Sequence, residues 1–252
     1  MSSLAEGATG TGAADRPAVA ARRLGGVLQG VALALGLLLL VGGFAGIAVL
    51  YRPYAVPTGS MEPGILAGDT VLGRTVSGST VGRGDVVVFQ DPVWGNETLV
   101  KRVVAVGGDT VAGDVRGGIT VNGTRIAEPY LEPAGPAPAG DAFSVTVPAG
   151  RLFVLGDNRT GSLDSRVHLD QDLGTVPDSA VKARVEATVW PFARFGPHHP
   201  TDAFAALGRP TAGRPGPLEP LFWACVGGAA LIVLTSLTGP VAALGRRLRG
   251  SR

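Results

Sequence analysis

Two long apolar runs constrain this chain more than any other feature. Residues 24–50 contain no charged side chain. As a helix they would span about 40 Å, against about 30 Å for the hydrocarbon core of a membrane. The run is longer than the apolar core of a signal sequence, about 7–15 residues, which indicates an uncleaved anchor. A second run covers residues 218–244, with Glu219 at its edge. The sequence therefore predicts transmembrane helices at 24–51 and 218–244.

Arginines lie at the outer end of each apolar run, before the first run and after the second. Arg22 and Arg23 precede the first run, and the basic tail 245–252 follows the second. The positive-inside rule then places both termini in the cytoplasm and residues 52–217 across the membrane. Residues 1–23 are rich in small and polar side chains, so we expect a disordered cytoplasmic tail. A helix-packing face could use the glycines at four-residue spacing, Gly26 with Gly30 and Gly42 with Gly46.

Composition excludes several kinds of site. The single cysteine, Cys225, lies in the second apolar run, so neither an intramolecular disulfide nor a cysteine metal cluster is expected. His198 and His199 lie in a Pro-rich stretch, and a histidine-based triad would have to use His168. We therefore expect no metal and no cofactor. Charges in residues 52–217 are nearly balanced, so a nucleic-acid partner is not expected either.

The segment between the apolar runs is predicted to be β structure. Short stretches rich in Val, Ile and Thr alternate with Gly, Pro, Asn and Asp, and no window has the pattern of an amphipathic helix. Asn122-Gly123 is the signal of a type I′ hairpin turn. Such a pattern favours an antiparallel sandwich or barrel-like fold, followed by a Pro/Gly-rich linker at 192–217. The predicted strands are 70–72, 85–89, 98–106, 119–121, 124–126, 143–147, 151–155 and 181–190.

Lysine is rare in this chain, which draws attention to Lys101. Of 22 Lys and Arg residues, only Lys101 and Lys182 are lysines. Arginine cannot act as a base in a protein, whereas a buried lysine can lose its proton. Lys101 lies within an apolar strand, with Leu99 and Val103 on its face by the period of two. Burial on that face would lower its pKa.

A candidate nucleophile lies in residues 57–63. Ser60 follows Gly59 between two prolines, which stiffen the backbone on either side of a possible bend. A serine beside a lysine of lowered pKa is a nucleophile–base pair. The two residues are far apart in sequence, so only the fold can bring them together.

Four segments resemble the ordered boxes of bacterial type I signal peptidases, and the resemblance covers roughly residues 24–191. Four boxes in order behind a membrane anchor are far more specific than any single motif. The resemblance implies an all-β extracytoplasmic catalytic domain at 52–191, with a small β insertion near 108–150. The boxes are 57–63 (PTGSMEP), 83–89 (RGDVVVF), 100–109 (VKRVVAVGGD) and 156–166 (GDNRTGSLDSR).

The same resemblance implies an activity and its site. A membrane-bound serine endopeptidase of the bacterial cell membrane would cleave signal peptides from exported preproteins after small residues, in the Ala-X-Ala pattern. Its partners would be signal peptides, membrane lipid and the secretion translocon. The resemblance implies Ser60 as nucleophile and Lys101 as general base, with the Ser60 N–H and the Thr58 hydroxyl as oxyanion hole. It implies that Ser162 orients the lysine. The implied supporting residues are Asn158 and two ion pairs, Arg102 with Asp157 and Asp164 with Arg166.

Two other functions fit parts of the sequence. A self-cleaving repressor-type peptidase also uses a Ser/Lys pair, but its Ala-Gly cleavage site is matched only by Ala45-Gly46, inside the first apolar run. No DNA-binding module accompanies it. A membrane-anchored β scaffold would leave Lys101 and the polar run 156–166 unexplained.

Overall fold

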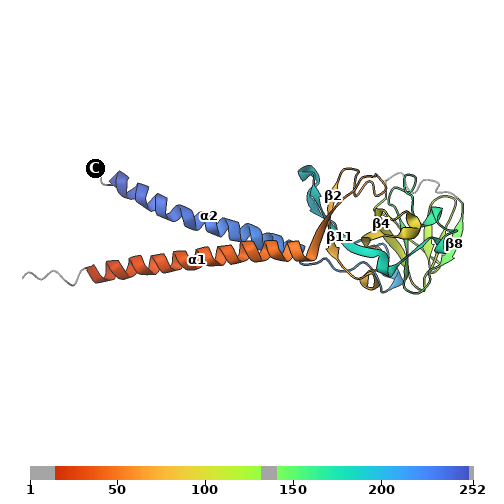
Figure 1. The fold of residues 1–252 in the computed structure, drawn as a ribbon, viewed down its shortest axis with the longest axis horizontal. Helices are drawn as coiled ribbons and strands as arrows, with labels where there is room; N and C mark the ends of the chain where they lie inside the picture. Colours follow the sequence, from red (N-terminus) through yellow and green to blue (C-terminus); the bar gives the residue numbers. More distant parts are fainter. Residues whose placement is uncertain (1–14, 132–140, 250–252) are drawn as a thin grey trace, which may run out of the picture. The chain divides into compact units, whose positions relative to one another are not determined.

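The computed structural model describes residues 15–131 and 141–249, with side chains described from 24 to 237. The chain divides into two compact units. One is Met1–Ile47 with Glu219–Arg252, and the other is Ala48–Leu218. The first unit contains the two long helices, and the second contains the β strands (Figure 1).

Helix α1 is Asp15–Leu50 and helix α2 is Leu218–Arg249. Their segments Leu24–Leu50 and Leu218–Leu237 are long and apolar enough to cross a membrane. Residues 15–23, which were expected to be disordered, are helical. Helix propagation from an apolar run costs little once the helix exists, and Ala and Arg are good helix formers. Residues 1–14 of the expected tail lie outside the described residues.

The two helices meet at small residues. A Cβ added at Gly36 would lie 3.0 Å from the Gly228 carbonyl oxygen, and one at Gly43 would lie 2.7 Å from the Leu221 carbonyl oxygen. Gly26, Gly30 and Gly42 have no such neighbour within 4 Å in the described chain. The contact therefore uses the seven-residue spacing of Gly36 and Gly43, and of the four-residue pairs only Gly46 contributes, against Leu221.

The β unit is built on one large antiparallel sheet. Its order is β1-β2-β11-β3-β4-β9-β10, with β12 paired to β11. This confirms the all-β antiparallel prediction. The edge strand β1 was not predicted, because it contains Pro53, which only an edge strand tolerates. The strands are β1 (Tyr51–Ala55), β2 (Thr70–Thr75), β3 (Val86–Gln90), β4 (Thr98–Val106), β9 (Arg151–Leu155), β10 (Thr175–Pro177), β11 (Val181–Trp190) and β12 (Gly196–Pro197).

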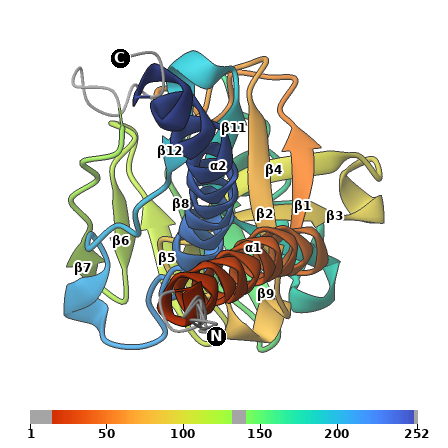
Figure 2. The ribbon, with the colours of Figure 1, turned by 90° about the vertical axis from the view of Figure 1, so that its left-hand side faces the viewer.

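A second, smaller antiparallel sheet has the order β7-β6-β5-β8 and lies beside the large sheet (Figure 2). Its strands are β5 (Thr110–Gly113), β6 (Ile119–Val121), β7 (Thr124–Arg125) and β8 (Phe143–Thr146). Asn122 and Gly123 have φ values of 52° and 76° between β6 and β7, as the predicted type I′ turn requires. Short 3-10 helices connect the strands of the β unit at Gly78–Thr80, Pro92–Trp94, Ser165–Val167, Asp172–Gly174, Asp178–Ala180, Phe192–Arg194 and Ala205–Leu207.

Three apolar clusters hold the β unit together. One joins the inner faces of the two sheets through Phe153, Val111 and Ile119. Another contains Phe89 of β3 and Trp94, together with Val103 of β4. The third surrounds the end of β1 and contains Val56, Met61, Ile65, Val71, Val88, Val100, Ala183 and Val185. Ser60 lies between two members of this third cluster, so its backbone is fixed on both sides.

Residues 196–217, which we call the strap, run along the β unit although they contain little regular structure. Phe204 is fully buried in the core between the sheets. The Arg83 side chain pairs with Asp109 at 2.5 Å and donates to the strap carbonyls of Gly208 and Pro210, both at 3.2 Å. The guanidinium itself is buried, with 5% of Arg83 exposed, so these carbonyls supply partners that water would otherwise provide.

The strap ends at a carboxylate shared with the beginning of the β unit. The Gly216 N–H and the Tyr51 hydroxyl both donate to Glu186 Oε2, each at 2.9 Å. Arg184 also contacts Glu186, at 3.0 Å, and donates to the Arg214 carbonyl at 2.5 Å. The stretch predicted as a linker is thus bound to the sheet through buried charged side chains.

Candidate active site

Ser60 and Lys101 lie in hydrogen-bond contact. The Lys101 Nζ is 2.8 Å from Ser60 Oγ and 3.1 Å from the Val100 carbonyl oxygen. Only 5% of Ser60 and 3% of Lys101 are exposed. Lys101 comes from the interior strand β4, whereas Ser60 follows the edge strand β1. The sheet therefore joins two residues that the sequence separates widely.

The local sequence explains why Ser60 is held at this point. Met61 is fully buried, and the turn after it closes with a hydrogen bond from Ile65 N–H to the Met61 carbonyl, at 3.0 Å. On β4, Lys101 pairs across the ladder with buried Val87. Ser60 and Lys101 are thus both held by buried apolar neighbours, which exclude water.

Burial changes the protonation of Lys101. Desolvation lowers the pKa of its amine to about 8, although the negative charges of Asp164 and Asp157 oppose that change. An amine with this pKa is neutral in a large fraction of molecules near pH 8. A neutral amine can accept the proton of a neighbouring hydroxyl.

Residues 156–166, which we call the polar loop, pack against the serine segment. The Asn158 N–H donates to the Ser60 carbonyl, and its side-chain amide donates to the Gly59 carbonyl, both at 3.1 Å. A Cβ added at Gly156 would lie 2.2 Å from Ser162 Oγ and 2.5 Å from the Ser60 carbonyl oxygen. Gly156 is therefore required at this crossing, a role that the sequence reasoning did not assign to it.

Two ion pairs expected from the resemblance are present around the site. Arg102 binds Asp157 through two hydrogen bonds, at 2.6 and 2.8 Å. Arg166 binds Asp164 in the same two-point manner, at 2.8 and 2.9 Å. Asp164 also accepts the Gly156 N–H at 2.9 Å. These contacts link β4 to the polar loop and link the two ends of that loop.

Thr58 and Ser162 are less firmly engaged. Thr58 is exposed, and its hydroxyl lies 3.5 Å from Ser60 Oγ. Ser162 is buried, yet its hydroxyl has no hydrogen-bond partner among the described residues. The expected bond from the Lys101 amine to Ser162 is thus not formed here, because the amine is directed to Ser60 and Val100.

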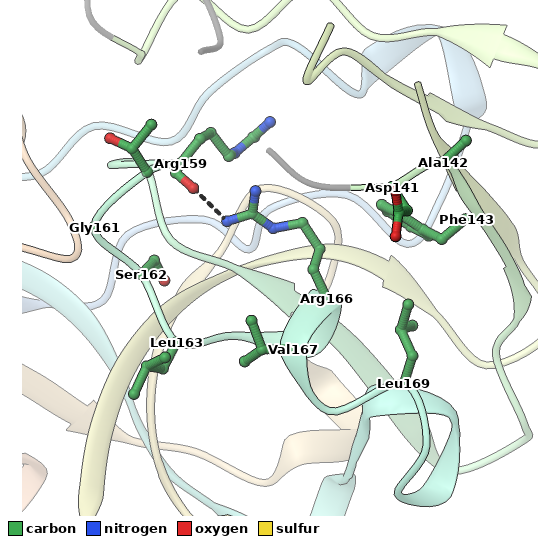
Figure 3. Close-up of a pocket in the computed structure, with 11 residues that line it drawn as sticks. Asp141, Ala142, Phe143, Arg159, Gly161, Ser162, Leu163, Arg166, Val167 and Leu169 are labelled. Carbon is green, nitrogen blue, oxygen red and sulfur yellow. Dashed lines mark hydrogen bonds between the residues drawn. The ribbon is translucent and has the colours of Figure 1, made fainter. Parts of the chain in front are cut away.

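A pocket of about 580 Å³ is lined by residues of the polar loop and of the segment 141–143 (Figure 3). Ser162, Arg159 and Arg166 line it together with apolar side chains that include Val167 and Leu169. Neither Ser60 nor Lys101 lines it. The pocket is therefore separate from the serine–lysine contact, and Ser162 borders both regions.

His168, the alternative base, is engaged elsewhere. Its ring stacks on Trp94 with a centroid distance of 4.2 Å, and its Nδ1 is 2.9 Å from the Asp164 carbonyl oxygen. Within the described residues no group of three or more His, Cys, Asp or Glu side chains could hold a metal ion.

Sequence reasoning overlooked Arg159, Glu128 and Tyr130. The Arg159 guanidinium forms a buried ion pair with Glu128, and the Tyr130 ring covers the Arg102 guanidinium at 4.0 Å. Arg159 was visible within a recognised motif, but Glu128 and Tyr130 lie in a Pro-containing loop with no periodic pattern. Nothing in the sequence alone connects that loop with the site.

Comparisons with known proteins show the family to which the chain is similar. The family model of signal peptidase, peptidase S26, matches residues 28–190. Signal peptidase I of Mycobacterium tuberculosis is 35% identical over 196 residues, covering 58% of this chain and 67% of that protein. Signal peptidase I of Bacillus licheniformis is 34% identical over 178 residues, covering 66% and 88%.

A solved signal peptidase I from Enterococcus faecalis has 29% identity and a TM-score of 0.34, with 40% of this chain and 93% of that chain covered. The family model's match at residues 28–190 includes both the serine segment and the polar loop. The chain therefore belongs to the signal peptidase family, peptidase S26, among the signal peptidase I enzymes.

Proposed function

We propose that this chain removes signal peptides from preproteins with Ser60 as nucleophile and Lys101 as general base. The contact of 2.8 Å between the buried amine and the serine hydroxyl carries the proposal. The lowered pKa of Lys101 supports it, because a base must be neutral before it can take a proton. Family membership supports the substrate class.

The reaction follows from this pair. The neutral Lys101 amine takes the proton of Ser60 as the oxygen attacks the carbonyl carbon before the cut. The tetrahedral intermediate collapses when the Lys101 ammonium gives its proton to the leaving amine, which becomes the new N-terminus. Water then attacks the acyl-enzyme, with Lys101 again as base, and restores Ser60.

The negative oxygen of the intermediate needs fixed donors. In this proposal the Ser60 N–H and the Thr58 hydroxyl supply them, and the position of Thr58 beside Ser60 Oγ supports that role. An ammonium has three hydrogens, of which Ser60 and Val100 receive two. Ser162 is proposed to accept the third once Lys101 is protonated.

The apolar cluster around Ser60 supports a preference for small residues. An extended substrate places alternate side chains on one face, so positions −1 and −3 face the protein together. Val56, Met61 and Val100 surround the serine with bulky, buried groups. We propose that they leave room for alanine at both positions and exclude larger side chains.

A preprotein substrate in detergent tests the function. Wild type should cleave a preprotein with Ala at −1, whereas Ser60→Ala should leave it intact. Wild type should also leave a Phe substitution at −1 uncleaved. Cleavage by Ser60→Ala would remove the nucleophile from the proposal, and equal cleavage of both substrates would remove the proposed size limit.

Membrane placement is part of the proposal. The two apolar helices and the flanking arginines support a cell-membrane protein with both termini in the cytoplasm and the β unit outside. Membrane lipid and the secretion translocon are its proposed neighbours there. Protease added to intact protoplasts should digest the β unit. Protection of that unit would contradict the proposed topology.

A further inference from the structure

The segment Ile126–Leu131 connects the small sheet with the residues around the dyad. Its two end residues are buried, with 5% of Ile126 and 8% of Leu131 exposed. Between them, Glu128 and Tyr130 extend toward the large sheet and the polar loop. We call this segment the clamp. Its ends are held by apolar packing, so the two polar side chains start from a fixed base.

Glu128 holds the polar loop through Arg159. Both side chains of this ion pair are almost fully buried, with 5% of Glu128 and 3% of Arg159 exposed, and Arg159 Nη1 lies 3.0 Å from Glu128 Oε2. Arg159 also donates to the Gly156 carbonyl at 3.1 Å. Its own carbonyl accepts a hydrogen bond from Arg166 at 2.8 Å (Figure 3).

Arg159 follows Asn158, the residue that contacts the serine segment. Asn158 donates to the carbonyls of Ser60 and Gly59. A shift of the Arg159 guanidinium would therefore move the backbone that supports the nucleophile. Among the described residues Glu128 is the carboxylate that forms an ion pair with Arg159, while Asp157 acts on Arg159 through its charge alone.

Tyr130 holds the other member of the dyad through Arg102. Its ring lies 4.0 Å from the Arg102 guanidinium carbon, and its hydroxyl donates to Glu128 at 2.7 Å. Arg102 follows Lys101 on β4 and binds Asp157 at two points. A guanidinium that is stacked and paired at once has little freedom to move.

We propose that Glu128 and Tyr130 are positioning residues that hold Ser60 and Lys101 in register for the cleavage reaction. The proposal rests on the function proposed above. Each residue acts on one neighbour of the dyad, and the hydrogen bond between them joins the two actions. In the described structure neither side chain contacts Ser60 or Lys101 themselves, so their loss should change the rate of the chemical step more than substrate binding.

Steady-state kinetics on a signal-peptide substrate test the clamp. Glu128→Gln and Tyr130→Leu should lower kcat about 10- to 100-fold with KM within about twofold, as expected when reacting groups lose alignment. Tyr130→Phe keeps the ring over Arg102 and should retain most of the activity. Arg125→Ala serves as the matched control, because it removes an exposed ion pair with Asp114 from the same small sheet.

Each outcome decides between the proposals. A melting temperature recorded for every variant identifies loss of folding, which would lower the amount of active enzyme but leave kcat per folded molecule unchanged. Unchanged kcat per folded molecule in Glu128→Gln and Tyr130→Leu would overturn the clamp. Equal losses in Tyr130→Leu and Tyr130→Phe would overturn the stacking role. Failure of wild type to cleave would instead overturn the proposed function, and the clamp with it.

Discussion

The polar loop and the strap are both irregular segments, yet they are fixed in different ways. The polar loop contains its own arginines, Arg159 and Arg166, which bind carboxylates and carbonyls close to the dyad. The strap instead supplies carbonyls to Arg83 and Arg184, which belong to the sheet region. The polar loop is held against the Ser60 segment, whereas the strap is held against the core of the β unit.

This difference separates two kinds of effect. A buried guanidinium can satisfy several carbonyls at once, so a segment without strands or helices can be as well ordered as the sheet. Where those contacts converge on the dyad, their loss should change the reaction. Where they join the strap to the core, their loss should change the stability of the fold and leave the reaction intact.

The largest effect is expected for Lys101→Arg. Arginine keeps the positive charge but cannot take the serine proton, so kcat should fall by at least about 10⁴-fold, as for other members of a catalytic set. Lys182→Arg is the matched control, since Lys182 is exposed on β11. Cleavage of a preprotein by each variant gives the measurement. Near-normal activity of Lys101→Arg would show that this lysine is structural. The polar loop would then no longer differ from the strap in supporting a catalytic pair.

Arg83→Leu should have the next largest effect, on stability. It leaves the buried Asp109 carboxylate without its guanidinium and removes two hydrogen bonds to the strap, which should lower the free energy of unfolding by about 3–5 kcal/mol. Urea titration measures this value, and kcat of the folded fraction should stay within about twofold. Arg214→Ala, an exposed side chain in the strap, should leave both unchanged. A loss of kcat in folded Arg83→Leu would show that the strap also governs the reaction.

The pH dependence of the wild type is the third test. Because the lysine pKa is lowered to about 8 and the neutral amine is the active form, kcat/KM should rise about tenfold per pH unit below 8 and level off above it. At pH 6 the expected value is about 100-fold below the plateau. Melting temperatures at each pH separate this titration from unfolding. A rate that stays constant or falls between pH 6 and 8 would contradict the role of Lys101.

Ser162→Ala should have the smallest effect. Its hydroxyl has no partner in the described structure, so the melting temperature should not change. If the hydroxyl orients the protonated lysine, kcat should fall about 2- to 10-fold, the equivalent of one hydrogen bond of about 0.5–1.5 kcal/mol. A loss as large as that of Lys101→Arg would place Ser162 among the groups that transfer the proton.

Sequence periodicity predicted the strands that have a strong β pattern. The predicted bounds of β4, β9 and β11 agree with the structure, because Val-rich stretches between turn residues have few alternatives. The edge strand β1 was missed at Pro53, and the three-residue β10 is too short to show a period. Local sequence pattern therefore identified the central strands of the large sheet better than its edge strands.

The site was predictable in its residue types but not in all its contacts. The rarity of lysine and the apolar surroundings of Lys101 indicated a base, the segment around Ser60 indicated a nucleophile, and the resemblance implied that the two act together. Their contact depends on strand order, which neither residue encodes alone. The clamp and the strap contacts join residues distant in sequence, and a single buried Glu or Arg leaves no periodic signal.

The shared carboxylate of Glu186 has a consequence for the β unit as a building block. Tyr51 lies near the beginning of the unit and Gly216 lies near its end, and both residues bind the same carboxylate oxygen. The two ends of the unit are therefore neighbours. A unit with adjacent ends can be inserted into a surface loop of another protein, or circularly permuted by a short connection, without stretching its backbone. The fold is thus suited to transplantation into any host with two nearby attachment points.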